Sequence, residues 1–168
     1  MILDEAFNIL LSRFTTGIEV KEWCVLKRYV VLELSSGVCG VAYYPHDVTP
    51  KIPNFRAKDP IKAARLYRSR VAGRRAIGVA VLNALTWALK PIPLGSATHL
   101  IRLMCGKRVA MVGYFRPLLH RFEHAGNLKI IERNEMEGVY PPEKAEEVLG
   151  EADVVLITGS CLVYGGLE

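Results

Sequence analysis

The spacing of apolar residues changes along the chain and predicts three kinds of structure. Between residues 2 and 14, apolar side chains recur at helical intervals, which predicts an amphipathic helix. Between residues 18 and 44, three short segments rich in β-branched and aromatic residues are separated by the turn sequences KR and SSG, which predicts a three-stranded meander. Residues 75–89 are apolar on almost every side, which is typical of a central, buried helix.

A second helix is expected between the meander and the central helix. It should begin at Pro60, because proline fits the first helical turn and the Asp59 carboxylate can cap the free N–H groups there. The helix is expected to run to about Val71, and Gly73 is expected to break it.

The second half of the chain alternates continuous apolar runs with helical segments. The apolar runs are residues 108–113, 128–132 and 153–159, and the helical segments are residues 117–126 and 141–150. This β-α-β-α-β order, with strands buried on both faces, predicts a parallel, right-handed, Rossmann-like sheet. We therefore expect an α/β protein with a small α+β subdomain, residues 1–94, and a Rossmann-like subdomain, residues 95–168.

Composition indicates a folded protein. Of 168 residues, 51% are hydrophobic and 23% are charged, so the chain can bury a core and is not disordered. The longest apolar run, residues 76–89, is too short to span a bilayer, so we expect no membrane partner. The acidic residues Asp4 and Glu5 stand where a signal peptide has basic residues, so we expect a cytoplasmic protein. The four cysteines form no CxxC pair and are expected to be buried thiols. Glutamine is absent and arginine outnumbers lysine, which favours a thermophilic source.

The net charge of +5 is concentrated in one stretch. Residues 51–75 hold nine basic side chains and one acidic one, so this stretch carries +8 and the remainder −3. It could bind nucleic acid, gather an anionic ligand or acidic partner, or form a solvated face. Nucleic acid is the least favoured partner, because Phe55 and Tyr67 are the only aromatic residues there for base stacking.

In an open parallel sheet, ligands bind beyond the carboxyl ends of the strands, and three such ends can be located here. The candidate ligand-binding residues are Gly113, Tyr114, Phe115, Glu132, Asn134, Thr158, Gly159 and Ser160. Asn83, the one strongly polar residue of the central helix, could point its amide toward the same site between the subdomains or be a satisfied core asparagine.

Glu132 follows Gly113 by 19 residues, close to the position of the ribose-binding acid in dinucleotide-binding folds. The full G-x-G-x-x-G motif is missing, because bulky residues follow Gly113. This disfavours NAD and leaves a nucleoside-like, adenosylmethionine-like or other small anionic ligand. The alternative is that Gly113 only permits a turn and Glu132 only caps a strand end.

The sequence HRFEH places His120 and His124 four residues apart, the spacing of inverted zinc peptidases. A catalytic zinc needs a third protein ligand, and the spacing singles out none of the glutamates that follow. We therefore interpret the pair as surface histidines and assign no metal ligand, no cofactor and no catalytic residue.

Several segments together resemble a known family. They are GKRVAMVGYF, KIIERNEMEGVYPPEKAEEVLGEADVVLITGS, GVAYYP and AIGVAVLNAL, and they are similar to the putative heavy-metal chelation family. The resemblance implies a Rossmann-like domain preceded by an enolase-N-terminal-like domain, and a role in heavy-metal handling or anaerobic cobalamin-type synthesis, without an assigned reaction. The matching family positions are Gly113, Phe115, Glu132, Thr158, Gly159, Ser160 and Asn83.

The chain departs from the family pattern at two points. Arg133, Asn134 and Glu135 stand where the family usually has Asn-Pro. The family also continues into further strands and helices, so we expect either a natural short version of the fold or a fragment. An uncovered last strand predicts a homodimer, or a higher closed oligomer, that buries residues 154–166 against a second copy. The alternative is that the N-terminal subdomain covers this edge within one chain.

Overall fold

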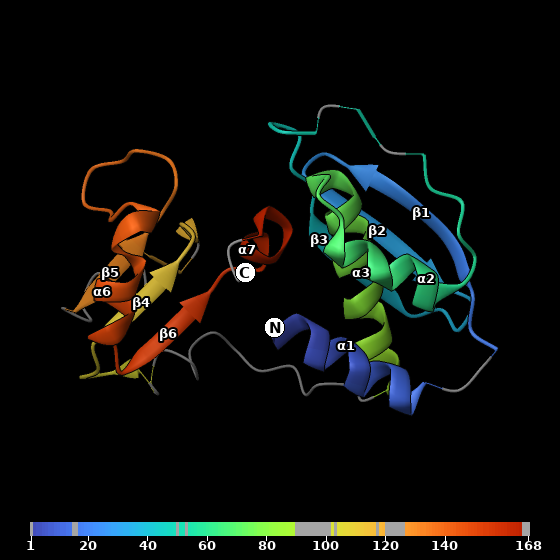
Figure 1. Ribbon diagram of the computed structural model, residues 1–168, viewed down its shortest axis with the longest axis horizontal. Coiled ribbons are helices and arrows are strands. Elements are labelled where there is room, and N and C mark those ends of the chain that lie inside the picture. The colour runs from blue at the N-terminus through green and yellow to red at the C-terminus, as the bar shows by residue number, and fades with distance from the viewer. Residues whose placement is uncertain are drawn as a thin grey trace. The chain divides into compact units, whose positions relative to one another are not determined.

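The chain folds into two compact units. The computed structural model describes residues 2–14, 17–49, 51, 52, 54–89, 102, 104–116, 118, 119 and 127–165. Unit 1 comprises residues 1–92 together with 162–168, and unit 2 comprises residues 93–161 (Figure 1).

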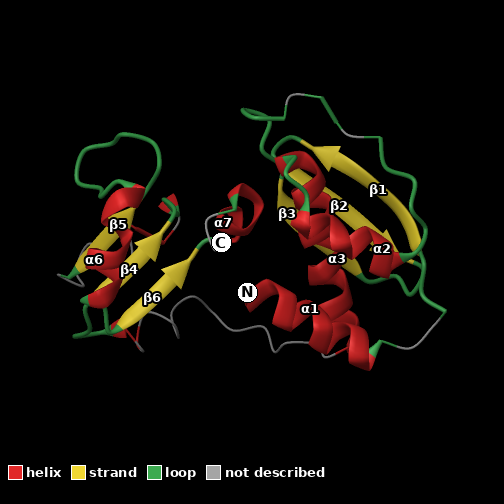
Figure 2. Cartoon of the chain, in the orientation of Figure 1, coloured by secondary structure: helices red, strands yellow, loops and turns green. Residues whose placement is uncertain are grey.

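Unit 1 is a three-stranded antiparallel sheet with helices on one face (Figure 2). Its elements are α1 (Ile2–Arg13), β1 (Val20–Leu26), β2 (Tyr29–Leu34), β3 (Cys39–Tyr43), α2 (Pro60–Ala64), the 3-10 helix η1 (Arg65–Arg68) and α3 (Ala72–Leu89). The strand order is β1-β2-β3, so the predicted meander is confirmed. Most of α3 is buried, as predicted for a central helix.

The sheet turns alternate residues toward α3. Val25, Val30 and Ala42 are paired across the three strands and pack inward, since the side-chain period of a strand is two. The next inward row ends in Gly40 on β3, where a Cβ atom would lie 2.0 Å from the backbone oxygen of Ala80. The missing side chain at Gly40 therefore lets α3 pack directly on β3.

The helix that starts at Pro60 is capped as predicted. The Asp59 carboxylate accepts the N–H groups of Ile61 at 2.8 Å and Lys62 at 3.2 Å. Helical structure ends at Arg68, because Ser69 is extended, with ψ of 140°.

The prediction that Gly73 separates two helices is wrong, because Gly73 lies inside α3. A Cβ atom there would come within 2.7 Å of Thr49 Cγ2 and 2.9 Å of Tyr44 Oη. The glycine is needed for close packing between distant segments and not as a helix breaker.

Unit 2 is a three-stranded parallel sheet with helical structure on its faces. Its described elements are β4 (Val109–Val112), β5 (Leu128–Ile131), the 3-10 helix η2 (Pro142–Lys144), α6 (Ala145–Gly150), β6 (Val154–Ile157) and the start of α7 (Gly159–Tyr164). The strand order is β5-β4-β6, and both pairings are parallel. The predicted mixed α/β class, with one antiparallel and one parallel sheet, is confirmed. Of the predicted helix over 117–126, residues 118 and 119 are described and helical, and the rest lies outside the described residues.

Both faces of the parallel sheet carry apolar clusters. Met104 and Met111 belong to a cluster on one face, and Ala110, Ile131 and Val148 form a cluster on the other. The two faces are distinct because successive strand residues point in opposite directions. The strands of this sheet are thus buried on both sides at its centre, as a parallel sheet requires.

Helix α7 begins in unit 2 and ends in unit 1 (Figure 1). Within unit 1, Val163 is fully buried in the core, and the Arg75 guanidinium donates a hydrogen bond to its carbonyl oxygen at 2.7 Å. The Tyr164 hydroxyl donates to the Asp47 carboxylate at 2.7 Å. Part of the segment expected at a dimer interface is therefore packed within its own chain.

The exposure of the cysteines differs from the expectation. Cys161 is buried, but Cys24, Cys39 and Cys105 are exposed, so the expectation of four buried thiols is wrong for three of them. Cys24 and Cys39 are exposed because they lie on the sheet face opposite α3. Among the described residues, no helix combines the length and apolar character needed to cross a membrane.

Candidate functional site

The three parallel strands end at one edge of the unit 2 sheet. Gly113 directly follows β4, Glu132 follows β5 and Thr158 follows β6. Since β4 lies at the centre and is parallel to both neighbours, these three residues meet at the carboxyl edge (Figure 2). The predicted site residues of unit 2 are thus brought to one place.

The turn after β4 depends on Gly113. Its φ of +86° lies in the left-handed region that favours glycine, and its N–H donates to the carbonyl oxygen of Ile131 at 2.8 Å. A Cβ atom at Gly113 would lie 2.2 Å from Thr158 Oγ1. The backbone of the β4 turn and the side chain of the β6 turn are therefore in direct contact.

Glu132 joins the turns after β4 and β5. Its Oε2 atom accepts the N–H of Tyr114 at 2.9 Å, and its Oε1 atom accepts the N–H of Asn134 at 3.2 Å. A carboxylate oxygen has two lone pairs, so each oxygen keeps capacity for one more donor. Glu132 thus positions both turns and can still accept a hydrogen bond from a ligand.

The turn after β6 contains a small hydrogen-bonded cluster. Thr158 Oγ1 lies 2.9 Å from Ser160 Oγ and 3.2 Å from Cys161 Sγ. The Cys161 thiol donates to the carbonyl oxygen of Val112 at 3.2 Å. Cys161 is thus a further residue of the site that was not predicted, because a single cysteine carries no spacing signal.

Two aromatic side chains are exposed at the same edge. Tyr114 is 38% exposed and Phe115 is 44% exposed. Exposed aromatic rings next to hydrogen-bonding groups are suited to stacking against a planar or apolar part of a ligand.

Comparison with known proteins supports the resemblance to a described family. Residues 7–86 and residues 96–168 each match a family described as putative heavy-metal chelation. The chain resembles this heavy-metal chelation family in both halves. The resemblance inferred from the sequence is therefore confirmed. No curated protein matches the chain significantly.

Two solved structures of family members share the fold. A protein of unknown function from Desulfitobacterium hafniense is 22% identical, with a TM-score of 0.76, and the alignment covers 96% of this chain and 68% of that one. A protein of unknown function from Pyrococcus horikoshii is also 22% identical, with a TM-score of 0.78, over 99% of this chain and 72% of that one. These similarities establish the fold.

The family's description raises the question of a bound metal. Heavy metals favour thiolate and imidazole ligands, and stable sites use three or four of them. Within the described residues, no group of three or more His, Cys, Asp or Glu side chains comes together. Glu132 and Cys161 are available at the sheet edge, but both already bond to backbone groups. The residues that the structure describes therefore do not provide a set of donors for a bare metal ion.

Three further residues were candidates from the sequence. His120 and His124 are outside the described residues, and the absence of a metal ligand there stays a prediction. Asn83 is exposed on α3, where its amide donates to the carbonyl oxygen of Val41 at 2.8 Å, so it is not a buried core asparagine. This bond fastens β3 to α3, and a role for Asn83 in ligand binding stays a prediction.

Proposed function

We propose that unit 2 binds a small, hydroxyl-bearing ligand of nucleoside-like chemistry at the carboxyl edge of its parallel sheet. The observation that supports this most is the Glu132 carboxylate. It holds the turns after β4 and β5 together and keeps acceptor capacity on both oxygens. Exposed Phe115 and Tyr114 offer rings to a base or another flat group.

The order of the strands also supports a ligand at this edge. The first strand of the unit, β4, lies at the centre, and the chain goes to β5 on one side and then to β6 on the other. Open α/β sheets bind ligands where the strand order reverses in this way, because the loops there separate and leave a crevice.

The family's description extends the proposal to heavy-metal handling. Since the described residues do not provide donors for a bare ion, the metal would reach this site as part of a metal-bearing ligand, such as a cofactor of the cobalamin type. Chemistry at the metal would then belong to the ligand, and the chain would bind and orient it.

Replacing Glu132 with glutamine tests the proposal. The glutamine amide keeps the size but replaces one carboxylate oxygen with an N–H donor, which would face the N–H of Tyr114 or of Asn134. We expect affinity for adenosine or S-adenosylmethionine to fall by about 1–3 kcal/mol, or roughly 5- to 150-fold, in titration calorimetry.

Glu135→Gln is the matched control. It makes the same chemical change on an exposed residue of the same loop and should leave affinity unchanged. Equal affinity of the two variants would remove Glu132 from the site. If the unaltered protein binds neither adenosine nor S-adenosylmethionine, the nucleoside-like class of ligand is wrong.

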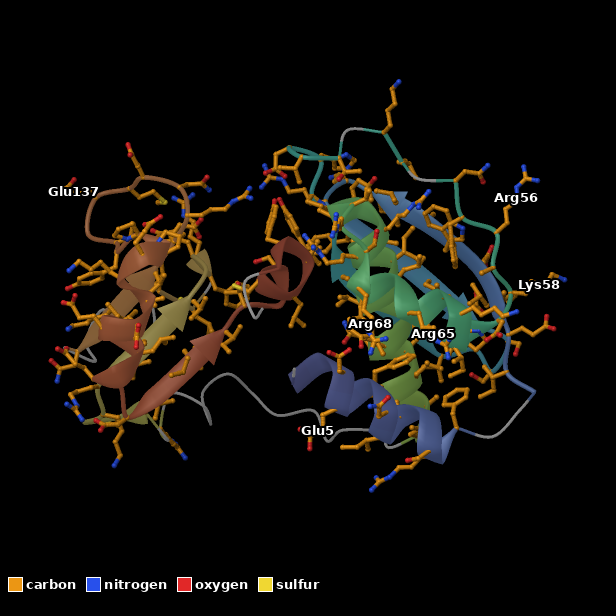
Figure 3. The ribbon with its side chains drawn as sticks, in the orientation of Figure 1. Glu5, Arg56, Lys58, Arg65, Arg68 and Glu137 are labelled. Atoms are coloured by element: carbon orange, nitrogen blue, oxygen red, sulfur yellow. The ribbon has the colours of Figure 1, made fainter. Side chains whose placement is uncertain are left out.

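A second candidate function, polyanion binding, rests on a row of basic side chains in unit 1. The side chains of residues 55–58 point alternately toward and away from the core. Phe55 and Ala57 pack toward the core, while Arg56 and Lys58 point outward (Figure 3). Lys62 and Arg65 continue the exposed row along α2 and η1.

The row carries unbalanced positive charge. None of its four members forms an ion pair with the described residues, whereas neighbouring Arg68 is paired with Asp4. Hydrogen bonds from Tyr67 and Arg68 lower the pKa of the Asp4 carboxyl below its usual value. Arg68 is therefore neutralised, and the row formed by Arg56, Lys58, Lys62 and Arg65 is the surface that a phosphate backbone would meet.

Salt dependence measures this second function. If all four cations contact phosphates, the logarithm of the association constant for a DNA duplex should fall with a slope of about −3 to −4 against the logarithm of salt concentration. Lys58→Ala with Lys62→Ala should reduce the slope by about 2, because two contacts are lost. Lys144→Ala, which removes a lysine paired with Glu147, is the control. No binding at low salt in fluorescence anisotropy would exclude this function.

A further inference from the structure

The face of the β1-β2-β3 sheet that points away from α3 has an ordered pattern of side chains. The strand register aligns Leu26 with Tyr29 and Tyr43, Cys24 with Val31 and Val41, and Glu22 with Glu33 and Cys39. These three rows form what we call the outer face. Two of its rows are apolar and the third is charged.

Four of the six residues in the apolar rows are exposed to solvent, whereas Val31 and Tyr43 are half-buried and the Tyr43 ring contacts Tyr164 of the same chain. Leu26 is 59% exposed, Tyr29 is 53% exposed and Val41 is 47% exposed. The rings of Tyr29 and Tyr43 meet edge to face, with centroids 6.4 Å apart, so part of this surface is already ordered. Single exposed apolar residues are ordinary, but a contiguous group across three strands is typical of an interaction surface.

The two ends of the outer face carry opposite charge. At one end, the turn between β1 and β2 consists of Lys27 and Arg28, which together carry +2. At the other end lie Glu22 and Glu33, with Lys21 hydrogen-bonded to Glu33 at 2.8 Å, which together carry −1. Asp47, which is bonded to the Tyr164 hydroxyl beside Tyr43, lies near the basic end and reduces its charge to +1, so the face stays polarised along the strand direction.

We propose that the outer face is the interface of a homodimer, in which a second copy of this chain packs face to face on it. A two-fold axis that brings two such faces together must lie in the plane between them. If the axis runs along the strands, Lys27 and Arg28 of the two copies are opposed, which is repulsive. If the axis runs across the strands, the basic turn of each copy lies over the acidic end of the other. Charge complementarity selects the second arrangement.

This interface differs from the one that the sequence predicted at residues 154–166. Val163 is buried within unit 1 of its own chain, which removes this residue of the segment from a dimer contact. Val155 and Ile157 on β6 are 42% and 48% exposed, so they remain a competing apolar surface and provide a control. The proposal is independent of ligand binding by unit 2.

Two double variants distinguish the surfaces. Leu26→Glu with Val41→Glu places like charges in the proposed interface, and both side chains are exposed enough for the monomer to fold. We expect this variant to weaken the dimer at least tenfold in sedimentation equilibrium, while Val155→Glu with Ile157→Glu leaves it unchanged. Circular dichroism checks that both variants are folded. A dimer that survives Leu26→Glu with Val41→Glu overturns the proposal, as does a native protein that stays a monomer of 18.7 kDa.

Native cysteines provide a second measurement. Cys24 lies in the middle of the outer face and Cys39 lies at its acidic end, while Cys105 is exposed in unit 2. Labelling by a maleimide, followed by peptide mass spectrometry, should slow at Cys24 and Cys39 as protein concentration rises, and stay constant at Cys105. Equal rates for all three cysteines at every concentration would contradict the interface.

Charge reversal tests the direction of the axis. Arg28→Glu alone or Glu22→Arg alone should weaken the dimer, because each variant places like charges opposite one another across the interface. The double variant should restore the dimer, because the basic and acidic groups then exchange places and opposite charges face each other again. A stronger dimer with Arg28→Glu alone would mean that like ends are opposed and would overturn the proposed arrangement.

Discussion

Replacing Gly40 with alanine is expected to destabilise unit 1 by more than about 3 kcal/mol. The new Cβ atom would lie 2.0 Å from the Ala80 oxygen and 2.7 Å from the Ala84 nitrogen, both backbone atoms of α3. Rotation of a side chain cannot relieve contacts with backbone atoms, so α3 would have to move away from β3. That movement would open the core beneath the helix.

Tryptophan fluorescence during chemical denaturation measures this effect, because both tryptophans, Trp23 and Trp87, lie in unit 1. Gly37→Ala in the same hairpin is the control. Gly37 has φ of +81° but no atom within 4 Å of an added Cβ, so alanine there should cost only the left-handed strain of about 1–2 kcal/mol. If the two variants lose equal stability, the close approach of α3 to β3 is wrong.

The elements of the fold that follow from local sequence were predictable. The Asp59–Pro60 start of α2 depends on neighbouring backbone groups, and the meander depends on strand segments joined by short turns. Contacts between distant segments were not predictable in this way. The sequence predicts a helix break at Gly73, because a glycine usually weakens a helix. The structure instead uses Gly73 for close packing against Thr49 and Tyr44, which are distant in sequence.

The same distinction applies to the candidate site. The meeting of Gly113, Glu132 and Thr158 at one edge follows from the parallel topology, which the alternation of strands and helices specifies. The hydrogen bond from the Tyr114 N–H to Glu132 depends on the conformation of two turns, which residue spacing does not predict. Cys161 was missed because a single cysteine carries no spacing signal, although its thiol bonds to Val112 within the site.

Glycine at position 113 links the fold of unit 2 to its proposed function, and Gly113→Ala is expected to destabilise unit 2 by about 3 kcal/mol or more. The left-handed φ of +86° contributes about 1–2 kcal/mol of strain once a Cβ is present. The remainder comes from contact of that Cβ with Thr158 Oγ1, which would be 2.2 Å away. Displacing Thr158 also breaks its contacts with Ser160 and Cys161.

Gly138→Ala separates the two contributions. Gly138 lies in the same unit with φ of +77° and has no atom within 4 Å of an added Cβ, so its alanine variant should show the strain alone. Hydrogen exchange of unit 2 peptides is the suitable measurement, because the tryptophans do not report on this unit. Equal losses in the two variants would contradict the packing of Thr158 against Gly113.

A double variant tests whether Thr158 causes the additional loss. Thr158→Ala removes the Oγ1 atom that the new Cβ would overlap, so Gly113→Ala should cost about 1–2 kcal/mol less in that background than alone.

The glycine variants also test whether packing at this edge affects ligand binding. Gly138→Ala should leave ligand affinity unchanged, because no atom lies within 4 Å of the added Cβ and the substitution therefore displaces none of the three strand-end turns. Gly113→Ala should reduce affinity even under conditions where unit 2 stays folded, because it displaces the turns after β4 and β6 together. Unchanged affinity in a folded Gly113→Ala variant would move the ligand away from this edge of the sheet.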